Sequence, residues 1–280
     1  MTLKRYATLT VAAIFLFTGC SNIYAPLANK DSDEARYEDA MKLLNDAKYS
    51  EAVARFESLS ADFMRKTSVR QYYAGALAGK CGYSMAGFVT FLSTADFTTS
   101  PFFKSLMNQF TGRVVAPEFC KAAEGVIKSI WAEETPTASQ QFFMVILSMS
   151  KIGAYLRAKG DIDGTDDLGD SDPDASFNVC NTSDFTDDDV KEVVTGFSLM
   201  LMNIGGFIGS MSGGTADTIN DINAACGVLS PNPCATTEAA NVDAGMITSM
   251  RNILNTGAAN PALPLGIGSC VNPDITQCCP

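Results

Sequence analysis

The N-terminal part of the chain carries apolar residues at helical spacing in two successive stretches, and equivalent residues of these stretches lie 34 positions apart. In the first stretch, Ala40 and Leu43 line one helix, and Ala52 and Phe56 line a second helix after a break at 45–48. Apolar residues every three or four positions indicate amphipathic helices, so the chain begins with helices in pairs. The 34-residue offset relates Ala40 to Ala74, Leu43 to Leu77, Tyr49 to Tyr83, and Ala52 to Ala86.

A period of 34 residues is that of the tetratricopeptide (TPR) repeat, and the sequence KYSEAVARF at 48–56 is typical of that family. Residues 34–96 therefore resemble two TPR-like helical hairpins, in which Tyr49 begins the second helix and Ala52 lets the paired helices approach closely. The chain departs from the family pattern, because the first helix lacks the usual Trp and Gly and neither repeat ends in the usual Pro. Two unrelated amphipathic hairpins are the alternative.

Beyond residue 96 the pattern stays helical but loses the period, which predicts an all-α fold with an irregular helical domain over 97–280. Thr186 before three aspartates is a favourable helix start, since a hydroxyl caps the helix and carboxylates sit at the positive end of its dipole. The apolar run 193–214 is expected to be a core helix that ends in a Gly-rich turn, with a membrane-inserting hairpin as the alternative. Helices are expected over 101–110, 117–131, 138–159, 187–202, 216–225 and 237–254.

The extreme N-terminus has the three parts of a secretory signal: Lys4 and Arg5, an apolar run over 7–17, and small residues before Cys20. It resembles the bacterial lipobox, after which a signal peptidase cuts before a cysteine that becomes lipidated. The resemblance implies a signal peptide over 1–19, diacylglycerol and a palmitate-type acyl chain on Cys20, and a lipidated tether over 20–33. Ser21 after the cysteine favours, by the same resemblance, the outer membrane and a periplasm-facing protein. An ordinary signal peptide is the alternative.

Eight further cysteines remain once Cys20 is assigned to the lipid. An even number of cysteines in an exported protein predicts a disulfide-braced fold with a Cys-rich C-terminal tail. Spacing suggests that Cys226 and Cys234 close a small loop, and that Cys270 pairs with one of the last two cysteines. A metal site is the alternative, but the chain has no histidine and no Cys-x-x-Cys pair. The disulfide candidates are Cys81, Cys120, Cys180, Cys226, Cys234, Cys270, Cys278 and Cys279.

Charge and composition exclude several classes of function. The net charge of −11 leaves no electrostatic footprint for nucleic acid, and it makes the lipid rather than a basic patch the means of membrane attachment. The absence of histidine excludes Ser-His-Asp and Cys-His catalysis. The sequence SMSK, from Ser148 to Lys151, matches the Ser-x-x-Lys signature of penicillin-binding enzymes, but its partner motifs are absent and it lies within an apolar helix, so we interpret it as a chance match.

The segment 159–174, KGDIDGTDDLGDSDPD, is rich in aspartate. It resembles the Asp-rich calcium loops of EF-hand-like and thrombospondin type 3 modules, with Gly164 at the sharp turn. It departs from them in having Lys159 at the first position and an aspartate at the twelfth. A solvated acidic linker is the alternative, and bound Ca²⁺ would be structural. The metal ligands that the resemblance implies are Asp161, Asp163, Thr165 (through its carbonyl), Asp167 and Asp170.

Together these features predict a lipid-anchored helical scaffold of the cell envelope that binds an envelope protein and is not an enzyme. Stacked hairpins leave a concave face for a peptide or helix, which Tyr37, Tyr72 and Tyr73 could line. A small-ligand-binding accessory lipoprotein of a transporter would instead need an apolar pocket between 138 and 211. A carboxylate-dependent envelope hydrolase would need two acids that face each other across a cleft.

Overall fold

The computed structural model describes residues 31–84, 87–88, 90–91, 100–162, 169–170, 172–205, 220, 222–224, 226–227 and 229–280. Across these residues the fold is all-α, apart from an isolated bridge between Thr256 and Cys270. The α-helices are α2 (Asp33–Asn45), α3 (Tyr49–Glu57), α4 (Ala61–Met64), α5 (Thr67–Lys80), α7 (Phe102–Asn108), α8 (Pro117–Trp131), α9 (Ala138–Gly160), α10 (Asp187–Ile204) and α12 (Ala244–Asn255). Two short 3-10 helices are η4 (Ala239–Asn241) and η5 (Ile275–Gln277).

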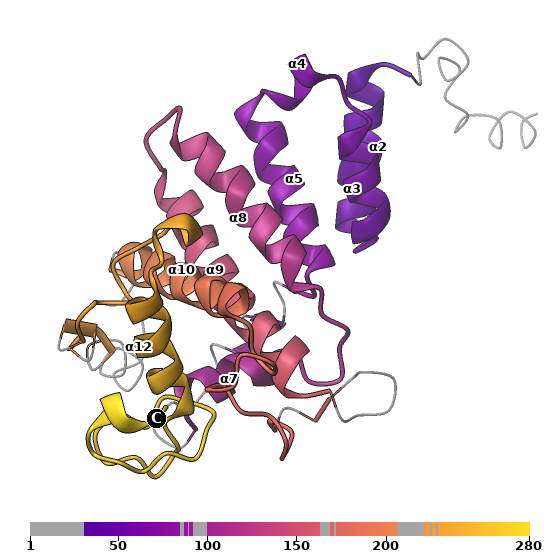
Figure 1. Ribbon diagram of the computed structural model, residues 1–280. Coiled ribbons are helices and arrows are strands. Elements are labelled where there is room, and N and C mark those ends of the chain that lie inside the picture. The colour runs from indigo at the N-terminus through magenta and orange to yellow at the C-terminus, as the bar shows by residue number, and fades with distance from the viewer. Residues whose placement is uncertain are drawn as a thin grey trace, which may run out of the picture.

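The helices pack largely in chain order. Helix α2 packs on α3, α3 on α5, α5 on α8, α8 on α9, and α9 on α10, while α7 covers α9 and α12 covers α10 (Figure 1). A single cluster of buried apolar side chains runs through these layers from Ala40 to Ile275. The helices on either side of residue 96 therefore share one core.

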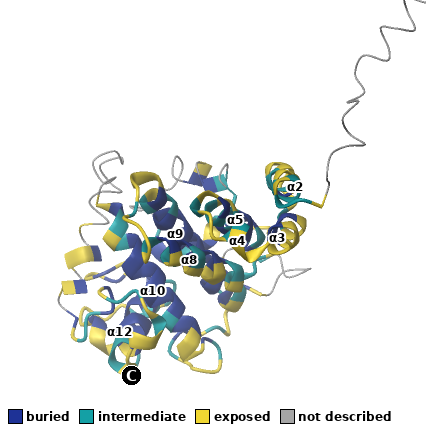
Figure 2. Ribbon diagram, turned by 90° about the horizontal axis from the view of Figure 1, so that it is seen from above, coloured by how far each residue is buried: buried dark blue, intermediate teal, exposed yellow. Residues whose placement is uncertain are grey.

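Helix α9 lies at the centre of the fold, and its residues 144–157 are all buried (Figure 2). Thr137 caps the helix in a reciprocal hydrogen-bonded box with Gln140. Glycines allow the neighbouring helices to approach. A Cβ atom on Gly153 would collide with the carbonyl oxygen of Leu106 in α7, and one on Gly196 of α10 would lie 3.0 Å from Cε of Lys151 in α9. Close approach at these glycines thus brings α7 and α10 against the middle of α9.

The first predicted hairpin is present as α2 and α3, and α5 begins at Thr67, which is 34 residues after the start of α2 at Asp33. Tyr49 begins α3, and its ring lies against Gly79 of α5, where a Cβ atom would collide with it. After α3, α5 packs mainly on α8. Membership of the TPR family stays a prediction. The repeat-packing residues Ala40, Ala52, Phe56, Ala74, Leu77 and Tyr83 are buried, Leu43 and Tyr49 are half-buried, and Ala86 lies outside the described residues.

The later helices match the sequence to different degrees. Helix α8 has the expected bounds, and α10 starts with the expected Thr186 cap, which Asp189 completes as a capping box. The expected helix over 237–254 is instead η4 followed by α12, because Asp243 caps a new helix by accepting a hydrogen bond from the Met246 N–H. The expected helix over 216–225, and the apolar run beyond 205, fall mostly outside the described residues. No helix among the residues described is long and apolar enough to cross a membrane.

Four disulfides brace the fold, as the even cysteine count predicts. The two short-range suggestions are confirmed, since Cys226 pairs with Cys234 and Cys270 pairs with Cys278. The long-range pairs could not be chosen from spacing. They are Cys81–Cys120, which joins the end of α5 to α8, and Cys180–Cys279, which ties the C-terminal tail to the segment before α10.

Candidate functional site

The ammonium group of Lys151 is fully buried between two carboxylates. Its Nζ lies 2.5 Å from Oε2 of Glu124 in α8 and 3.2 Å from Oε2 of Glu192 in α10, and it donates a hydrogen bond of 2.8 Å to Oγ1 of Thr195. The side chains of Glu124 and Glu192 are only 8% and 6% exposed. Three separate helices, α8, α9 and α10, thus meet at one charge.

The two carboxylates continue outward to the surface. The other oxygen of Glu192 lies 2.6 Å from Nζ of Lys121, and the other oxygen of Glu124 lies 3.7 Å from Nζ of Lys128. Lys128 in turn contacts Glu238 at 2.5 Å and donates a hydrogen bond of 2.8 Å to the carbonyl of Thr237. We call this alternating row of three lysines and three glutamates the charge chain; in order, it is Glu238, Lys128, Glu124, Lys151, Glu192 and Lys121.

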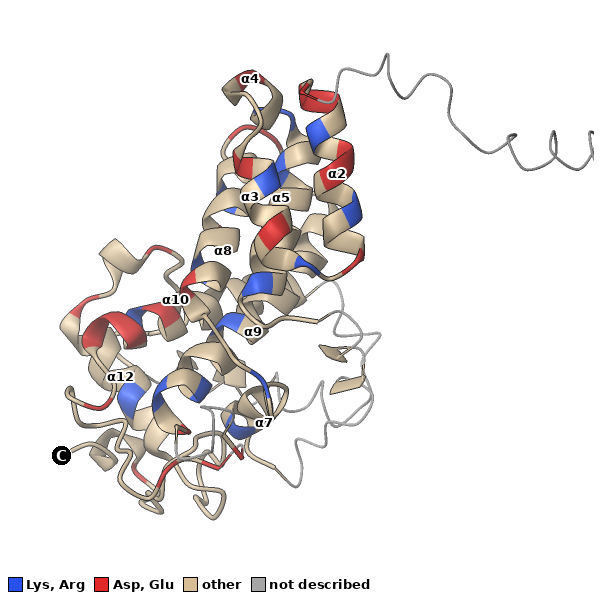
Figure 3. Ribbon diagram, turned by 90° about the vertical axis from the view of Figure 1, so that its right-hand side faces the viewer, with Lys and Arg blue, Asp and Glu red and all other residues tan. Residues whose placement is uncertain are grey.

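The charge chain is needed because an isolated charge in a protein interior is strongly unfavourable. Each buried carboxylate faces one buried and one rim ammonium, so every buried charge has neighbours of the opposite sign. The hydrogen bond to Glu192 raises the pKa of Lys121, which favours its ammonium form. Acidic residues also gather at the start of α10, next to this row (Figure 3).

A hollow of about 420 Å³, lined by several charged residues, lies beside the charge chain, between α8, α10 and the segment 237–239. We call it the Gly125 hollow. Gly125 forms part of its wall, and a Cβ atom on this glycine would meet nothing within 4 Å. The rim carries Lys121 and Lys128 from α8 and Glu238 from the facing segment. The hollow therefore presents both signs of charge around an open helix surface.

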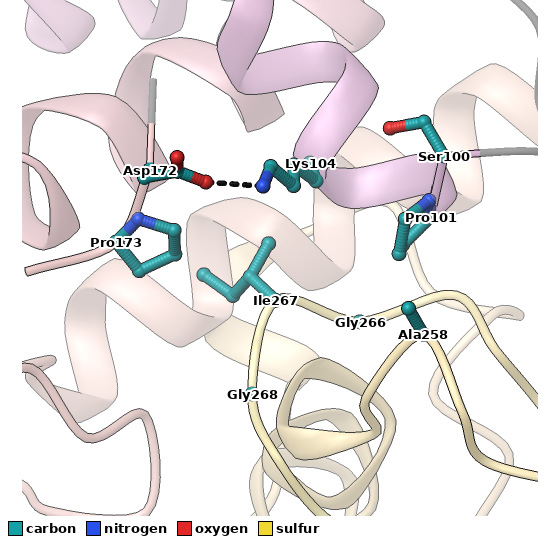
Figure 4. Close-up of a pocket in the computed structure, with 9 residues that line it drawn as sticks. All are labelled: Ser100, Pro101, Lys104, Asp172, Pro173, Ala258, Gly266, Ile267 and Gly268. Atoms are coloured by element: carbon teal, nitrogen blue, oxygen red, sulfur yellow. Dashed lines mark hydrogen bonds and ion pairs between the residues drawn. The ribbon is translucent and has the colours of Figure 1, made fainter. Parts of the chain in front are cut away.

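A second hollow, of about 390 Å³, joins three distant parts of the chain (Figure 4). Lys104 of α7 points across it to form an ion pair with Asp172, while Ile267 and the neighbouring glycines come from the segment after α12. This ion pair links the end of the Asp-rich segment to the core helices.

An aromatic surface lies where α2 meets α5, around Tyr37 and Tyr72. Tyr37 of α2 contacts the rings of Phe56, Phe63 and Tyr72 at centroid distances of 6.2, 5.8 and 6.3 Å. Tyr72 is 43% exposed, and Ala40 is the buried residue of α2, so this helix is covered on one side (Figure 2). Below the surface, burial raises the pKa of the Tyr73 phenol to about 12, and its hydrogen bond to Glu57 acts in the same direction. Of the three predicted tyrosines, Tyr37 and Tyr72 therefore touch, and Tyr73 packs on Phe56.

The described part of the Asp-rich segment is held by protein groups. Oδ2 of Asp161 lies 3.2 Å from Nε of Arg157, and Oδ1 accepts a hydrogen bond of 3.0 Å from the backbone N–H of Asp170. Asp170 accepts one of 2.9 Å from the N–H of Asp172. Among the residues that the structure describes, no three potential ligand side chains gather around a common point. Calcium binding stays a prediction, since three of its expected ligands lie outside the described residues: Asp163, Thr165 and Asp167.

The Ser-x-x-Lys sequence does not form an accessible pair. Ser148 and Lys151 are both fully buried beneath α10, and the Lys151 ammonium contacts glutamates. The sequence contained a signal for this network, because Lys151 stands within an apolar helix and a buried lysine requires partners. Its partners Glu124 and Glu192 could not be found from local pattern, since they come from other helices.

Comparison with known proteins gives no family for this chain. No model of a known protein family matches it, and neither a curated protein nor a solved structure does.

Cys20, the residue predicted to carry the lipid, lies outside the described residues.

The charge chain makes a direct prediction about stability. Replacing Lys151 by Met leaves two buried carboxylates without their shared ammonium, and we expect it to lower the free energy of unfolding by about 3–5 kcal/mol. Lys121→Met removes a 58% exposed partner of the same Glu192 and is expected to cost less than about 1 kcal/mol. Urea unfolding of the two variants measures both values, and equal losses would contradict a central role for Lys151.

Proposed function

We propose that the protein is a lipid-anchored helical scaffold of the bacterial cell envelope, which faces the periplasm and binds a protein partner through the aromatic surface of α2 and α5. The observation that carries this proposal is the exposed ring of Tyr72, which packs edge-on against Tyr37 beside a helix that has few buried residues. Clustered aromatic side chains with part of their surface in water are enriched at protein interfaces.

Two further features support the envelope setting. The four disulfides fit an oxidising compartment outside the cytoplasm. The N-terminal sequence resembles a lipoprotein signal that ends at Cys20, and a lipid on this residue would hold the helical fold at the membrane surface.

The other two functions receive less support. The apolar pocket of the transporter accessory protein was expected between 138 and 211, where the described helices α9 and α10 are packed into the core. A glycosidase-type hydrolase needs one carboxylic acid and one carboxylate across a cleft, whereas Glu124 and Glu192 each contact two lysines.

The partner surface is tested by site-specific photocrosslinking in the native host. A photoreactive phenylalanine analogue at position 72 is expected to trap a discrete protein adduct, because the ring there is 43% exposed within the aromatic surface. The same analogue at Phe142 is the matched control, since this aromatic residue is 37% exposed and lies on α9 outside the surface. Equal adducts from both positions, or none from position 72, would contradict the proposed interface.

The anchor is tested separately by intact mass spectrometry of the protein purified from host membranes. We expect loss of residues 1–19, added acyl mass on Cys20, and eight thiols that react with an alkylating reagent only after reduction. A retained N-terminus without acyl mass would refute the lipid anchor, while leaving the aromatic surface to be judged by crosslinking.

A further inference from the structure

Gly125 has no packing reason to be glycine. It lies in the interior of α8, where glycine weakens a helix relative to alanine. A Cβ atom at this position would meet no atom within 4 Å, so no neighbouring helix requires its absence. Any larger side chain would, however, extend into the Gly125 hollow. The glycine therefore leaves this part of the wall of the hollow without a side chain.

The volume and the charges of the hollow suit a small polar molecule. Its volume of about 420 Å³ falls within the range of small-molecule sites, which runs from roughly 300 to 1,000 Å³. The charges are pre-positioned, because Glu124 and Glu192 are held from below by the buried Lys151. Fixed polar groups of this kind orient a ligand without having to be ordered when it binds.

The pattern of charge selects the class of ligand. An anion that enters the hollow meets the rim ammonium groups of Lys121 and Lys128 but also the carboxylates beside them. A cation meets the carboxylates but also the lysines. A molecule with both charges can exchange the rim ion pairs, with its carboxylate toward the rim lysines and its ammonium toward Glu238, whose side chain is 56% exposed. Unfavourable pairing of like charges thus disfavours ligands of a single sign.

We propose that the Gly125 hollow binds a small zwitterion of the amino-acid type. This inference is independent of the partner-binding surface on α2 and α5, because none of the residues of that surface lines the hollow.

The proposal is tested by isothermal titration calorimetry of the folded, disulfide-intact protein with glycine and 4-aminobutyrate. Butylamine and butyrate are the matched probes that each carry one of the two charges. We expect at least one zwitterion to bind with a dissociation constant of about 1 mM or below, at least about tenfold tighter than either single-charge probe. Zwitterions that bind no tighter than butylamine or butyrate would overturn the assigned ligand class, and an absence of binding by every probe would overturn the site.

Two leucine variants test whether the zwitterion binds in the Gly125 hollow. Gly125→Leu adds a bulky side chain at the wall of the hollow and is expected to weaken zwitterion binding at least about tenfold. Gly75→Leu is the matched control, because Gly75 also lies inside a helix, α5, with nothing within 4 Å of an added Cβ atom. Equal affinity of the two leucine variants would overturn the site.

A second pair of variants keeps the test decisive if a leucine variant fails to fold. Lys121→Gln removes a rim ammonium that is 58% exposed, and we expect it to weaken binding at least about tenfold. Lys191→Gln is its control, since Lys191 pairs with Asp188 on α10 and does not line the hollow. Unchanged affinity of Lys121→Gln would contradict the proposed contact with the ligand carboxylate.

Discussion

The fold depends on how the ammonium group of Lys151 is accommodated in the middle of α9. A charge with no exposure to water must be paired, because its desolvation is otherwise not compensated. Glu124 supplies one carboxylate from α8 and Glu192 supplies another from α10, so the pairing fixes the position of three helices at once. The register of these helices is then not free to shift without separating the charges. Apolar packing alone would specify this register less strictly, because the hydrophobic effect has no preferred direction.

Glycine and cystine complete this arrangement at longer range. Gly153 lets α7 approach α9, and Gly196 lets α10 approach α9 beside Lys151. The Cys81–Cys120 disulfide links α8 to the end of α5, and the N-terminal hairpin packs on α5. At the other end, the buried Arg251 of α12 donates hydrogen bonds to the carbonyls of Val179 and Phe185, next to the Cys180–Cys279 disulfide. The helical core is thus joined to the N-terminal helices by one disulfide and to the C-terminal tail by another.

The sequence predicted features that depend on local pattern. The bounds of α8, the Thr186 cap and a helix that contains Ala74 and Leu77 all follow from periodicity or capping residues close in the chain. The charge chain was missed because its members are joined across separate helices, with Glu124 and Glu192 lying 27 and 41 residues from Lys151. The pairing of Cys180 with Cys279 was left open for the same reason, since 99 residues separate them.

Local sequence pattern was also insufficient to predict the aromatic surface and the Gly125 hollow. Tyr37 and Tyr72 were predicted only as candidates for a concave face, and it is the packing of α2 against α3 and α5 that brings them together. Gly125 carried no signal in the sequence, because a glycine in a helical pattern gains meaning only when the space around its missing side chain is known. The α2–α3 hairpin and the charge chain therefore describe two different levels of the same fold, one local and one long-range.

Hydrogen exchange in increasing urea tests this account most directly. Amides that open only on global unfolding mark the most stable unit of a protein, while those that open earlier mark its weaker parts. The account predicts that the amides of α8, α9 and α10 around Lys151 exchange last, and that those of α2 exchange earlier. Protection that is strongest in α2 and α3, with earlier exchange in the middle of α9, would contradict the claim that the buried charge organises the fold.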